Sequence, residues 1–329
     1  MNRTMELIDS YGRKINYLRL SVTDRCNMRC SYCMPAEGVD KLPRADILSY
    51  DELFRIARAA VALGIEKIRV TGGEPLVRKG ITGFLARLAD IHGLRQLVLT
   101  TNALSLEEMA VDLRSAGVQR LNISLDSLRP EVFARITRGG DLSRVLAGIA
   151  AAERSGFPVK INMVVMRGVN DAEVVDFASL AIDKPYTVRF IEYMPAIKEN
   201  DWHSLTVPSQ EILDRIGLKY NCRPIDRKDL AGPAREYRIE GGAGTIGIIT
   251  PISGHFCGNC NRIRVTSRGI ARGCLFSETE TDLKPFLKTS DLRGLNEALR
   301  GIVTSKPGRH QITACHSGHS PFAMASIGG

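Results

Sequence analysis

The order of apolar segments between residues 15 and 192 constrains the fold of this chain more than any other feature. Runs rich in β-branched residues alternate there with segments in which apolar residues recur every three to four positions. Continuous apolar strands separated by amphipathic helices indicate a parallel sheet that is buried on both faces. Six strand–helix units are too few for a closed eight-unit barrel, so the sequence predicts an α/β fold, a partial, open TIM-like (βα)6 barrel. The predicted strands span 15–22, 67–71, 96–101, 120–125, 159–165 and 187–191, and the predicted helices span 51–63, 81–91, 106–115, 142–155 and 172–182.

Local signals mark the ends of several predicted helices. Ser49 and Glu52 form an S-x-x-E capping box, and Gly64 stands where a C-terminal cap of the same helix is expected. Asp141 and Asp171 are predicted to cap two later helices. These signals place helix boundaries independently of the apolar periodicity.

The composition is that of an ordinary globular protein, with 44% hydrophobic and 25% charged residues. No apolar run approaches the ~20 residues that a membrane span needs, and the polar N-terminus does not resemble a secretory signal. We therefore expect a cytoplasmic protein and exclude membrane, collagenous and low-complexity classes. A length of 329 residues predicts about two domains. We place a barrel domain at residues 1–226 and a C-terminal α+β extension, which carries the second cysteine set, at 227–329.

Polar residues follow the predicted strands at the ends where barrel enzymes carry their chemistry. Each one alone is explained by a turn or a helix cap, but six such strand ends together favour one ligand site. These residues are Thr71 to Pro75, Thr100 to Asn102, Asn122, Ser124, Asp126, Lys160, Asn162, Arg189 and Glu192.

Six of the eight cysteines occur in two sets of three. In a long cytosolic chain, clustered thiols are more often metal ligands than disulfide partners. Three thiolates suit an iron–sulfur cluster with one open iron, or a zinc site whose fourth ligand lies elsewhere. The first set is Cys26, Cys30 and Cys33, the second is Cys257, Cys260 and Cys274, and Cys222 and Cys315 stand alone.

The segment around the first set resembles the radical S-adenosylmethionine superfamily. The mark of that superfamily is CxxxCxxC with an aromatic residue before the last cysteine, and Tyr32 occupies this position. The sequence Gly-Gly-Glu-Pro at 72–75 resembles its GGEP motif. The resemblance implies a [4Fe–4S] cluster whose fourth iron is chelated by S-adenosylmethionine. Reduction of the cluster would cleave that cofactor and release a 5′-deoxyadenosyl radical.

The second set narrows the resemblance to one family. Between residues 255 and 277 there are four arginines and no acidic residue. This region, together with RLSVTDRCN, TGGEPL, TTN, NISLDS, KINMV, FIEYMP, FCGNCNRIR and the terminal Ile-Gly-Gly, resembles the MoaA family of GTP 3′,8-cyclases over nearly the whole chain. The resemblance implies a second [4Fe–4S] cluster on Cys257, Cys260 and Cys274, with its open iron facing the guanine of GTP.

The activity that this family implies is a lyase reaction and the first step of molybdenum cofactor biosynthesis. The radical takes hydrogen from C3′ of the ribose, and C3′ then joins C8 of guanine. The product is (8S)-3′,8-cyclo-7,8-dihydroguanosine 5′-triphosphate. The resemblance further implies a homodimer, an electron donor and a downstream cyclic pyranopterin monophosphate synthase. Neither nucleic acid nor a membrane is expected as a partner.

The basic residues fit a triphosphate independently of the resemblance. Guanidinium groups bind phosphate oxygens bidentately, and Arg262 and Arg264 point to the same face of a strand because side chains alternate. A solvated or nucleic-acid-binding face is the alternative. It is disfavoured because these arginines alternate with metal ligands rather than with aromatic residues.

The resemblance also assigns roles to single residues. Catalytic roles fall on Cys26, Cys30, Cys33, Arg19 (a candidate donor of the final hydrogen), Arg262, Arg264, Gly328 and Gly329. Contacts with S-adenosylmethionine are expected from Tyr32, Gly73, Ser124 and Met194. Contacts with GTP are expected from Arg19, Arg69, Thr100, Lys160, Arg262, Ile263 and Arg264. The structural alternatives are strand-edge charges for Arg19, Arg69 and Lys160, and core packing for Met194 and Ile263.

Two positions depart from simple expectation. Ala103 follows TTN, where the family commonly has glycine, and a positive φ there would strain it by about 1 kcal/mol. The terminal Gly328-Gly329 would ordinarily be a frayed end, whereas the family inserts it toward the active site. The histidines of the tail, His310, His316 and His319, could bind a metal, but a solvated polar tail is favoured.

Two other functions stay open at this point. One is a radical enzyme that modifies a peptide or protein and uses its C-terminal cluster as an electron relay. A peptide needs no triphosphate site, so the Arg262/Arg264 pair argues against it. The other is a zinc-bearing RNA-binding protein, which would be colourless and contain zinc.

Overall fold

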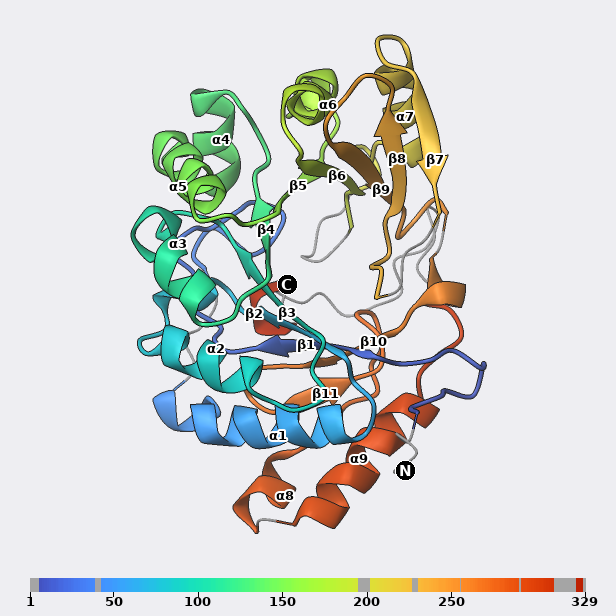
Figure 1. Cartoon of the computed structure of the whole chain (residues 1–329). Coiled ribbons are helices and arrows are strands. Elements are labelled where there is room, and N and C mark those ends of the chain that lie inside the picture. The colour runs from blue at the N-terminus through green and yellow to red at the C-terminus, as the bar shows by residue number, and fades with distance from the viewer. Residues whose placement is uncertain are drawn as a thin grey trace.

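The computed structural model describes residues 6–38, 43–194, 202–226, 230–254, 256–289, 291–310 and 324–327. The described strands form one twelve-stranded sheet in the order β12-β11-β10-β1-β2-β3-β4-β5-β6-β9-β8-β7. The first six strands pair in parallel in chain order and curve into an open barrel wall (Figure 1). These strands are β1 (Tyr17–Ser21), β2 (Lys67–Thr71), β3 (Gln96–Thr101), β4 (Arg120–Ser124), β5 (Val159–Val165) and β6 (Thr187–Glu192).

Helices cover the outer face of this wall (Figure 1). Strand side chains alternate between the two faces, as the period of a strand requires. In β2, Ile68 and Val70 are fully buried in the hydrophobic core, while Arg69 and Thr71 line the interior cavity. The covering helices are α1 (Tyr50–Ala62), α2 (Ile81–Ala89), α3 (Leu106–Ser115), α4 (Pro130–Thr137), α5 (Leu142–Arg154) and α6 (Val174–Asp183), with 3₁₀ turns η1 (Arg44–Asp46), η2 (Pro75–Val77) and η3 (Asp171–Glu173).

The C-terminal third of the chain adds strands to both ends of the barrel wall. One added strand, β10, pairs in parallel with β1, and another, β9, pairs in parallel with β6. The remaining added strands pair antiparallel outside these two. The added elements are α7 (Ser209–Gly217), β7 (Cys222–Ile225), β8 (Arg235–Ile239), β9 (Thr245–Ile249), η4 (Cys257–Asn259), β10 (Arg262–Val265), β11 (Ile270–Arg272), β12 (Thr281–Asp282), α8 (Lys284–Lys288), α9 (Leu292–Thr304) and α10 (Met324–Ile327).

The predicted partial barrel is confirmed, and every predicted strand and helix lies within two residues of its predicted ends. The Ser49–Glu52 capping box is present, and Gly64 has a φ of 106° directly after the C-cap of α1. Asp141 accepts a hydrogen bond from the backbone N–H of Ser143 at the start of α5.

Two details of the prediction were wrong. Asp171 does not cap a helix, because a 3₁₀ turn begins there and its carboxylate accepts from the N–H of Gly168 and pairs with Arg215. Helix α4 was not predicted. It begins with Pro130 at its first position, where a proline is well tolerated, and its eight residues are too few for a clear apolar period.

The turn at Ala103 has the conformation that its sequence context suggested. Ala103 has a φ of 65° and is completely buried. Its carbonyl packs on α5, where a Cβ added to Gly148 would lie only 2.5 Å from the Ala103 oxygen. The glycine inside α5 therefore makes room for a strained turn that follows β3.

We expect Gly148→Ala to destabilise the fold by about 1–3 kcal/mol, because the new methyl group meets backbone rather than a movable side chain. Gly83→Ala is the matched control. Gly83 also lies inside a helix, but nothing is within 4 Å of an added Cβ, so this change should stabilise by about 0.5–1 kcal/mol. Urea denaturation followed by circular dichroism measures both. Equal stability of the two variants would contradict the packing argument.

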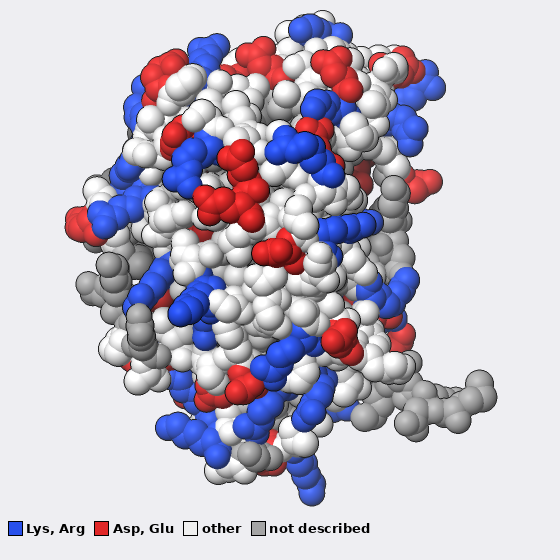
Figure 2. Space-filling model, turned by 60° about the vertical axis from the view of Figure 1, so that its left-hand side comes forward, with Lys and Arg blue, Asp and Glu red and all other residues white. Residues whose placement is uncertain are grey.

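The outer surface carries charges of both signs. Figure 2 shows basic and acidic side chains interspersed over one face, rather than a continuous basic area. Buried basic side chains in the barrel interior, Arg19, Arg69 and Arg264 among them, hold part of the formal charge of +9. Within the described ranges, no helix is both long enough and apolar enough to cross a membrane.

Candidate active site

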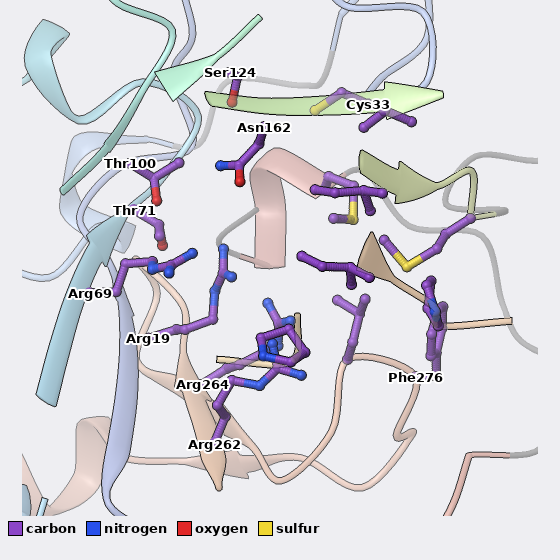
Figure 3. A pocket seen from close by; sticks show the side chains of 18 of the residues that line it. Arg19, Cys33, Arg69, Thr71, Thr100, Ser124, Asn162, Arg262, Arg264 and Phe276 are labelled. Atoms are coloured by element: carbon purple, nitrogen blue, oxygen red, sulfur yellow. The ribbon is translucent and has the colours of Figure 1, made fainter. Parts of the chain in front are cut away.

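Both cysteine sets line one cavity inside the barrel. Its volume is about 280 Å³. Figure 3 shows Arg19, Arg69, Arg262 and Arg264 on one side of this cavity and Cys33 across it. In the part of the chain that the structure describes, Glu74 is the one carboxylate in the lining. The basic side chains of the lining are Arg13, Arg19, Arg69, Arg189, Arg262, Arg264 and Lys306.

The first cysteine set lies in the loop that follows β1. Two backbone groups, the N–H groups of Cys33 and Met34, donate to the Cys30 carbonyl at 2.9 and 3.2 Å and turn the loop. The sulfur of Cys26 accepts from the N–H of Met28 at 3.4 Å. Burial raises the pKa of both the Cys26 and the Cys30 thiol.

The GGEP segment supports this loop directly. A Cβ on Gly72 would lie 2.6 Å from the Thr23 carbonyl oxygen, and one on Gly73 would lie 2.4 Å from that of Arg25. The N–H of Gly73 donates to the Thr23 carbonyl at 2.8 Å. The two glycines thus allow the loop after β2 to pack against the backbone that leads into Cys26.

Glu74 ties the same loop to the end of β3. Its carboxylate accepts from the Thr101 hydroxyl at 2.8 Å, from the Asn102 N–H at 2.7 Å and from the Leu76 N–H at 3.1 Å. Burial raises its pKa to about 7, against these hydrogen bonds, which lower it. Asn102 in turn reaches the Cys26 sulfur at 3.9 Å, so the TTN turn also supports the cysteine loop.

The carboxylate of Asp126 holds Tyr32. From the sequence, Asp126 could either contact a ligand or cap the next segment. The Tyr32 hydroxyl donates to Asp126 at 2.8 Å, and the other Asp126 oxygen accepts from the Val164 N–H at 2.9 Å. Burial raises the pKa of Asp126 to about 6. Asp126 therefore fixes the aromatic ring of the cysteine motif instead of capping the next segment.

The second cysteine set has a different electrostatic environment. Cys257 begins η4, Cys260 precedes β10 and Cys274 follows β11. Burial raises the pKa of the Cys260 thiol, but the positive charges of Arg262 and Lys306 outweigh it and lower that pKa to about 6. The Arg262 guanidinium lies 3.8 Å from the Cys260 sulfur, and the Lys306 ammonium lies 3.5 Å from it.

Three arginines stand side by side across three neighbouring strands. In the register of the sheet, Arg19 of β1 is the partner of Arg69 in β2 and of Arg264 in β10. Each of the three is at most 9% exposed. Burial, Arg264 and Arg69 together lower the pKa of Arg19 well below its usual value. Such a row of buried like charges is unfavourable unless an anion compensates it.

Unpartnered polar atoms point to the same conclusion. Among the described residues, the Nε of Arg69 and the hydroxyls of Thr71 and Thr100 are buried without a hydrogen-bond partner. All three residues line the cavity. Buried polar groups are nearly always satisfied, so their donors fit a polyanionic ligand.

The donor sets also fit iron–sulfur clusters. Soft thiolates are the usual ligands of such clusters, three of them leave one iron open, and each thiolate binds a different iron. A single zinc ion would need its ligands close together. In the described ranges, no three His, Cys, Asp or Glu side chains are grouped closely enough to hold one metal ion.

Most predicted site residues lie in the cavity lining, but two side chains do not. The side chain of Ile263 is turned to the opposite face of β10 and is fully buried in the hydrophobic core, as its structural alternative anticipated. Lys160 is absent from the described lining, and its ammonium lies 3.6 Å from Glu236, which also accepts from Arg189 at 2.8 Å. Those within the lining are the six cysteines, Arg19, Tyr32, Arg69, Gly73, Thr100, Ser124, Met194, Arg262 and Arg264.

The predictions for the tail mostly fall outside the described residues. Gly328, Gly329, Cys315, His316 and His319 are in this group. The described segment just before the two glycines does reach the site, because the N–H of Met324 donates to the Cys33 carbonyl at 3.0 Å and Met324 lines the cavity.

Arg189, which the sequence placed among the polar strand-end residues of one ligand site, lines the cavity from β6. Sequence reasoning assigned no role to two other basic residues of the lining, Arg13 and Lys306. Arg13 and Lys306 reach the second cysteine set from segments near opposite ends of the chain. No local pattern marks them, because only the tertiary fold brings them there.

Two family models match this chain in succession. The Radical SAM superfamily matches residues 20–181, and Molybdenum Cofactor Synthesis C matches residues 186–312. Among solved structures, Streptococcus suis SuiB bound to S-adenosylmethionine has a TM-score of 0.58 at 14% identity, covering 88% of this chain and 69% of that one. At that identity the likeness shows the fold alone.

Curated relatives extend over the whole chain. The GTP 3′,8-cyclase of Geobacter sulfurreducens is 70% identical over 326 residues, which cover 99% of this chain and 100% of the relative. The GTP 3′,8-cyclase of Alkaliphilus oremlandii is 44% identical over 323 residues, with 98% and 99% coverage. By this full-length similarity, the chain belongs to the GTP 3′,8-cyclase family of the radical S-adenosylmethionine superfamily.

Proposed function

We propose that this protein converts GTP to (8S)-3′,8-cyclo-7,8-dihydroguanosine 5′-triphosphate, with S-adenosylmethionine and two [4Fe–4S] clusters as cofactors. The observation that carries the proposal is the shared cavity, in which two thiolate triads and a row of buried arginines face one another. One triad beside a neutral cavity would suit many radical enzymes. Two triads in one cavity, together with enough buried arginines to compensate a triphosphate, suit a nucleotide that lies between the triads.

The residues divide the work as follows. Cys26, Cys30 and Cys33 would hold one cluster, and Cys257, Cys260 and Cys274 the other. When bound, the first cluster and S-adenosylmethionine supply the radical that takes hydrogen from C3′ of the ribose.

The remaining residues bind and orient. Tyr32, Gly73, Ser124 and Met194 line the same cavity as the first triad and would contact S-adenosylmethionine, and Thr100, also in the lining, would contact GTP. The arginines Arg19, Arg69, Arg189, Arg262 and Arg264 hold the phosphates. Anchoring the triphosphate fixes the ribose relative to the first triad, which is the geometry that C3′ abstraction needs. We also propose that Arg19 gives the proton of the final reduction, whose electron a bound cluster would supply, and that Gly328 and Gly329 take part in the reaction.

Lys160 should make the affinity for GTP depend on pH. Burial and the neighbouring Arg189 lower its pKa to about 7, although Glu236 opposes them. A triphosphate bound beside Arg189 adds negative potential and raises that pKa. Below pH 7 the lysine is already charged. Above pH 7 binding must take up a proton, so affinity for GTP should fall as the pH rises from about 7 to 9.

Calorimetry of GTP binding without S-adenosylmethionine, in buffers of different ionisation enthalpy, measures this proton uptake. The γ-phosphate of GTP titrates near pH 6 to 7 and works in the opposite direction. The comparison is therefore with Lys160→Met, which removes the contribution of Lys160 and keeps that of the γ-phosphate. An identical pH slope in both proteins would contradict the assignment.

The decisive experiment is chemical. Anaerobically reconstituted, reduced protein is incubated with S-adenosylmethionine and GTP, and the product is identified by mass spectrometry and NMR. We expect the 3′,8-cyclised nucleotide and release of 5′-deoxyadenosine that depends on GTP. Release of 5′-deoxyadenosine no faster than without GTP would overturn the proposal. About eight iron atoms per chain would support two clusters.

The family further supports a place for this reaction in the cell. We propose a cytoplasmic homodimer that receives electrons from a reducing partner. Its product would pass to a cyclic pyranopterin monophosphate synthase in molybdenum cofactor biosynthesis. The family model named Molybdenum Cofactor Synthesis C, which covers residues 186–312, is the support for this placement.

A further inference from the structure

The segment that follows α9, from Lys306 to His310, lies against the second cysteine set. Lys306 is 3% exposed, and its ammonium donates to the Cys260 sulfur at 3.5 Å and to the Gly273 carbonyl next to Cys274. At the other end of the segment, the backbone N–H of His310 forms a hydrogen bond with the Cys257 sulfur. One short segment thus donates to two of the three thiolates.

Arg13 fixes this segment in place. Its guanidinium donates to the carbonyls of Pro307 and Gly308, at 2.8 and 3.0 Å, and to that of Cys257 at 2.7 Å. Asp9 holds the same guanidinium at 2.5 Å. His310 adds a contact between its Nε2 and the Pro251 carbonyl at 3.0 Å. The segment is therefore a defined part of the wall around the second cysteine set.

The positive charge of Lys306 is compensated by cysteine thiolates and not by a carboxylate of the described residues. In the described residues, no carboxylate lies within ion-pair distance of its ammonium, and the negative groups that act on it are the Cys260 and Cys274 thiolates. A buried ammonium without an anionic partner is strongly unfavourable. Gly273 allows the approach, because a Cβ there would lie 3.1 Å from both the Cα and the Cβ of Lys306.

We propose that Lys306 is a positioning residue of the C-terminal cluster, which holds the Cys260 sulfur and raises the reduction potential of that cluster. Hydrogen bonds to cluster sulfurs and nearby positive charge both stabilise the reduced, more negative state. This inference rests on the second cluster of the proposed function. The redox step is a one-electron exchange between the cluster and an electrode or dithionite, with no bond made or broken.

The test is an EPR-monitored redox titration of the reconstituted full-length chain. It is repeated in the background Cys26→Ala, Cys30→Ala, Cys33→Ala, where the C-terminal cluster alone contributes. Lys306→Met keeps the length of the side chain and removes its charge, so we expect the midpoint potential of the C-terminal cluster to shift to more negative values. Lys306→Arg keeps the charge, so its midpoint potential should stay close to that of the wild-type protein.

Two controls separate a local effect from a global one. Lys288→Met removes the same charge from an exposed position at the end of α8 and should leave both potentials unchanged. The N-terminal cluster is the internal reference, since the buried charges that act on its thiolates are Glu74 and Asp126 rather than Lys306. An equal shift of both clusters would overturn the proposal, as would an unchanged C-terminal potential in Lys306→Met.

Metal content distinguishes the remaining outcomes. If wild-type protein bound only about four iron atoms, the two-cluster function would fail and not merely the role of Lys306. Loss of the second cluster in Lys306→Met with retention in Lys306→Arg would support the proposal, because charge is what the two differ in. Loss in both would overturn it.

Discussion

Protein with Cys26→Ala will release no 5′-deoxyadenosine or methionine above background. Three thiolates hold three irons and leave the fourth for S-adenosylmethionine, so a set reduced to two no longer defines that open position. The Cys26 sulfur is also the one that the Met28 N–H and the Asn102 amide support. Iron content should fall from about eight to about four atoms per chain, because the second triad is untouched.

Cys222→Ala is the matched control for this experiment. Cys222 is half-buried on β7 and belongs to neither triad. Its variant should keep both the iron content and the rate of cleavage, which are measured by iron assay and by chromatography of the products. Cleavage at the wild-type rate in Cys26→Ala would show that the first triad does not hold the reactive cluster.

The second large effect is expected at Arg264. Arg264→Ala removes one member of the arginine row and should weaken GTP binding roughly 10- to 100-fold, the contribution of one or two charge-assisted hydrogen bonds. Iron content should stay intact, since all six cysteines of the two sets are retained in Arg264→Ala. The loss should be large for GTP and small for guanosine, which has no phosphates.

Arg293→Ala is the control for loss of one positive charge. Its side chain is 90% exposed on α9 and pairs with Glu297. A second readout separates binding from folding. Without nucleotide, Arg264→Ala relieves repulsion from Arg19 and Arg262, so its unfolding temperature should not fall. Normal GTP affinity in Arg264→Ala would refute the triphosphate site.

Much of the fold could be predicted because its signals are local. Apolar runs, the Ser49 capping box and the strand phase of Arg262 and Arg264 each depend on a few neighbouring residues. The cysteine spacing likewise singled out the six cysteines that line the cavity. Strand phase also gave the reason that Ile263 faces away, since it lies between two inward-facing arginines.

What could not be predicted depends on contacts between distant segments. The pairing of β10 with β1 joins residues about 245 positions apart, and it alone brings Arg264 beside Arg19. Arg13 and Lys306 carry no motif, and their role follows from where the two ends of the chain meet the second cysteine set. The family resemblance implied that Lys160 contacts GTP, but the local sequence did not reveal Glu236 beside it.

The sheet order determines whether the barrel strands can fold without the C-terminal third of the chain. The C-terminal third supplies the strand that covers the outer edge of β1 and also the strand that covers the outer edge of β6. If the six barrel strands were produced without the C-terminal third, the outer edges of β1 and β6 would carry unpaired backbone groups. Unpaired strand edges are the usual template for aggregation. The barrel strands and the C-terminal third therefore depend on each other for folding, and the row of Arg69, Arg19 and Arg264 crosses one of the two edge pairings.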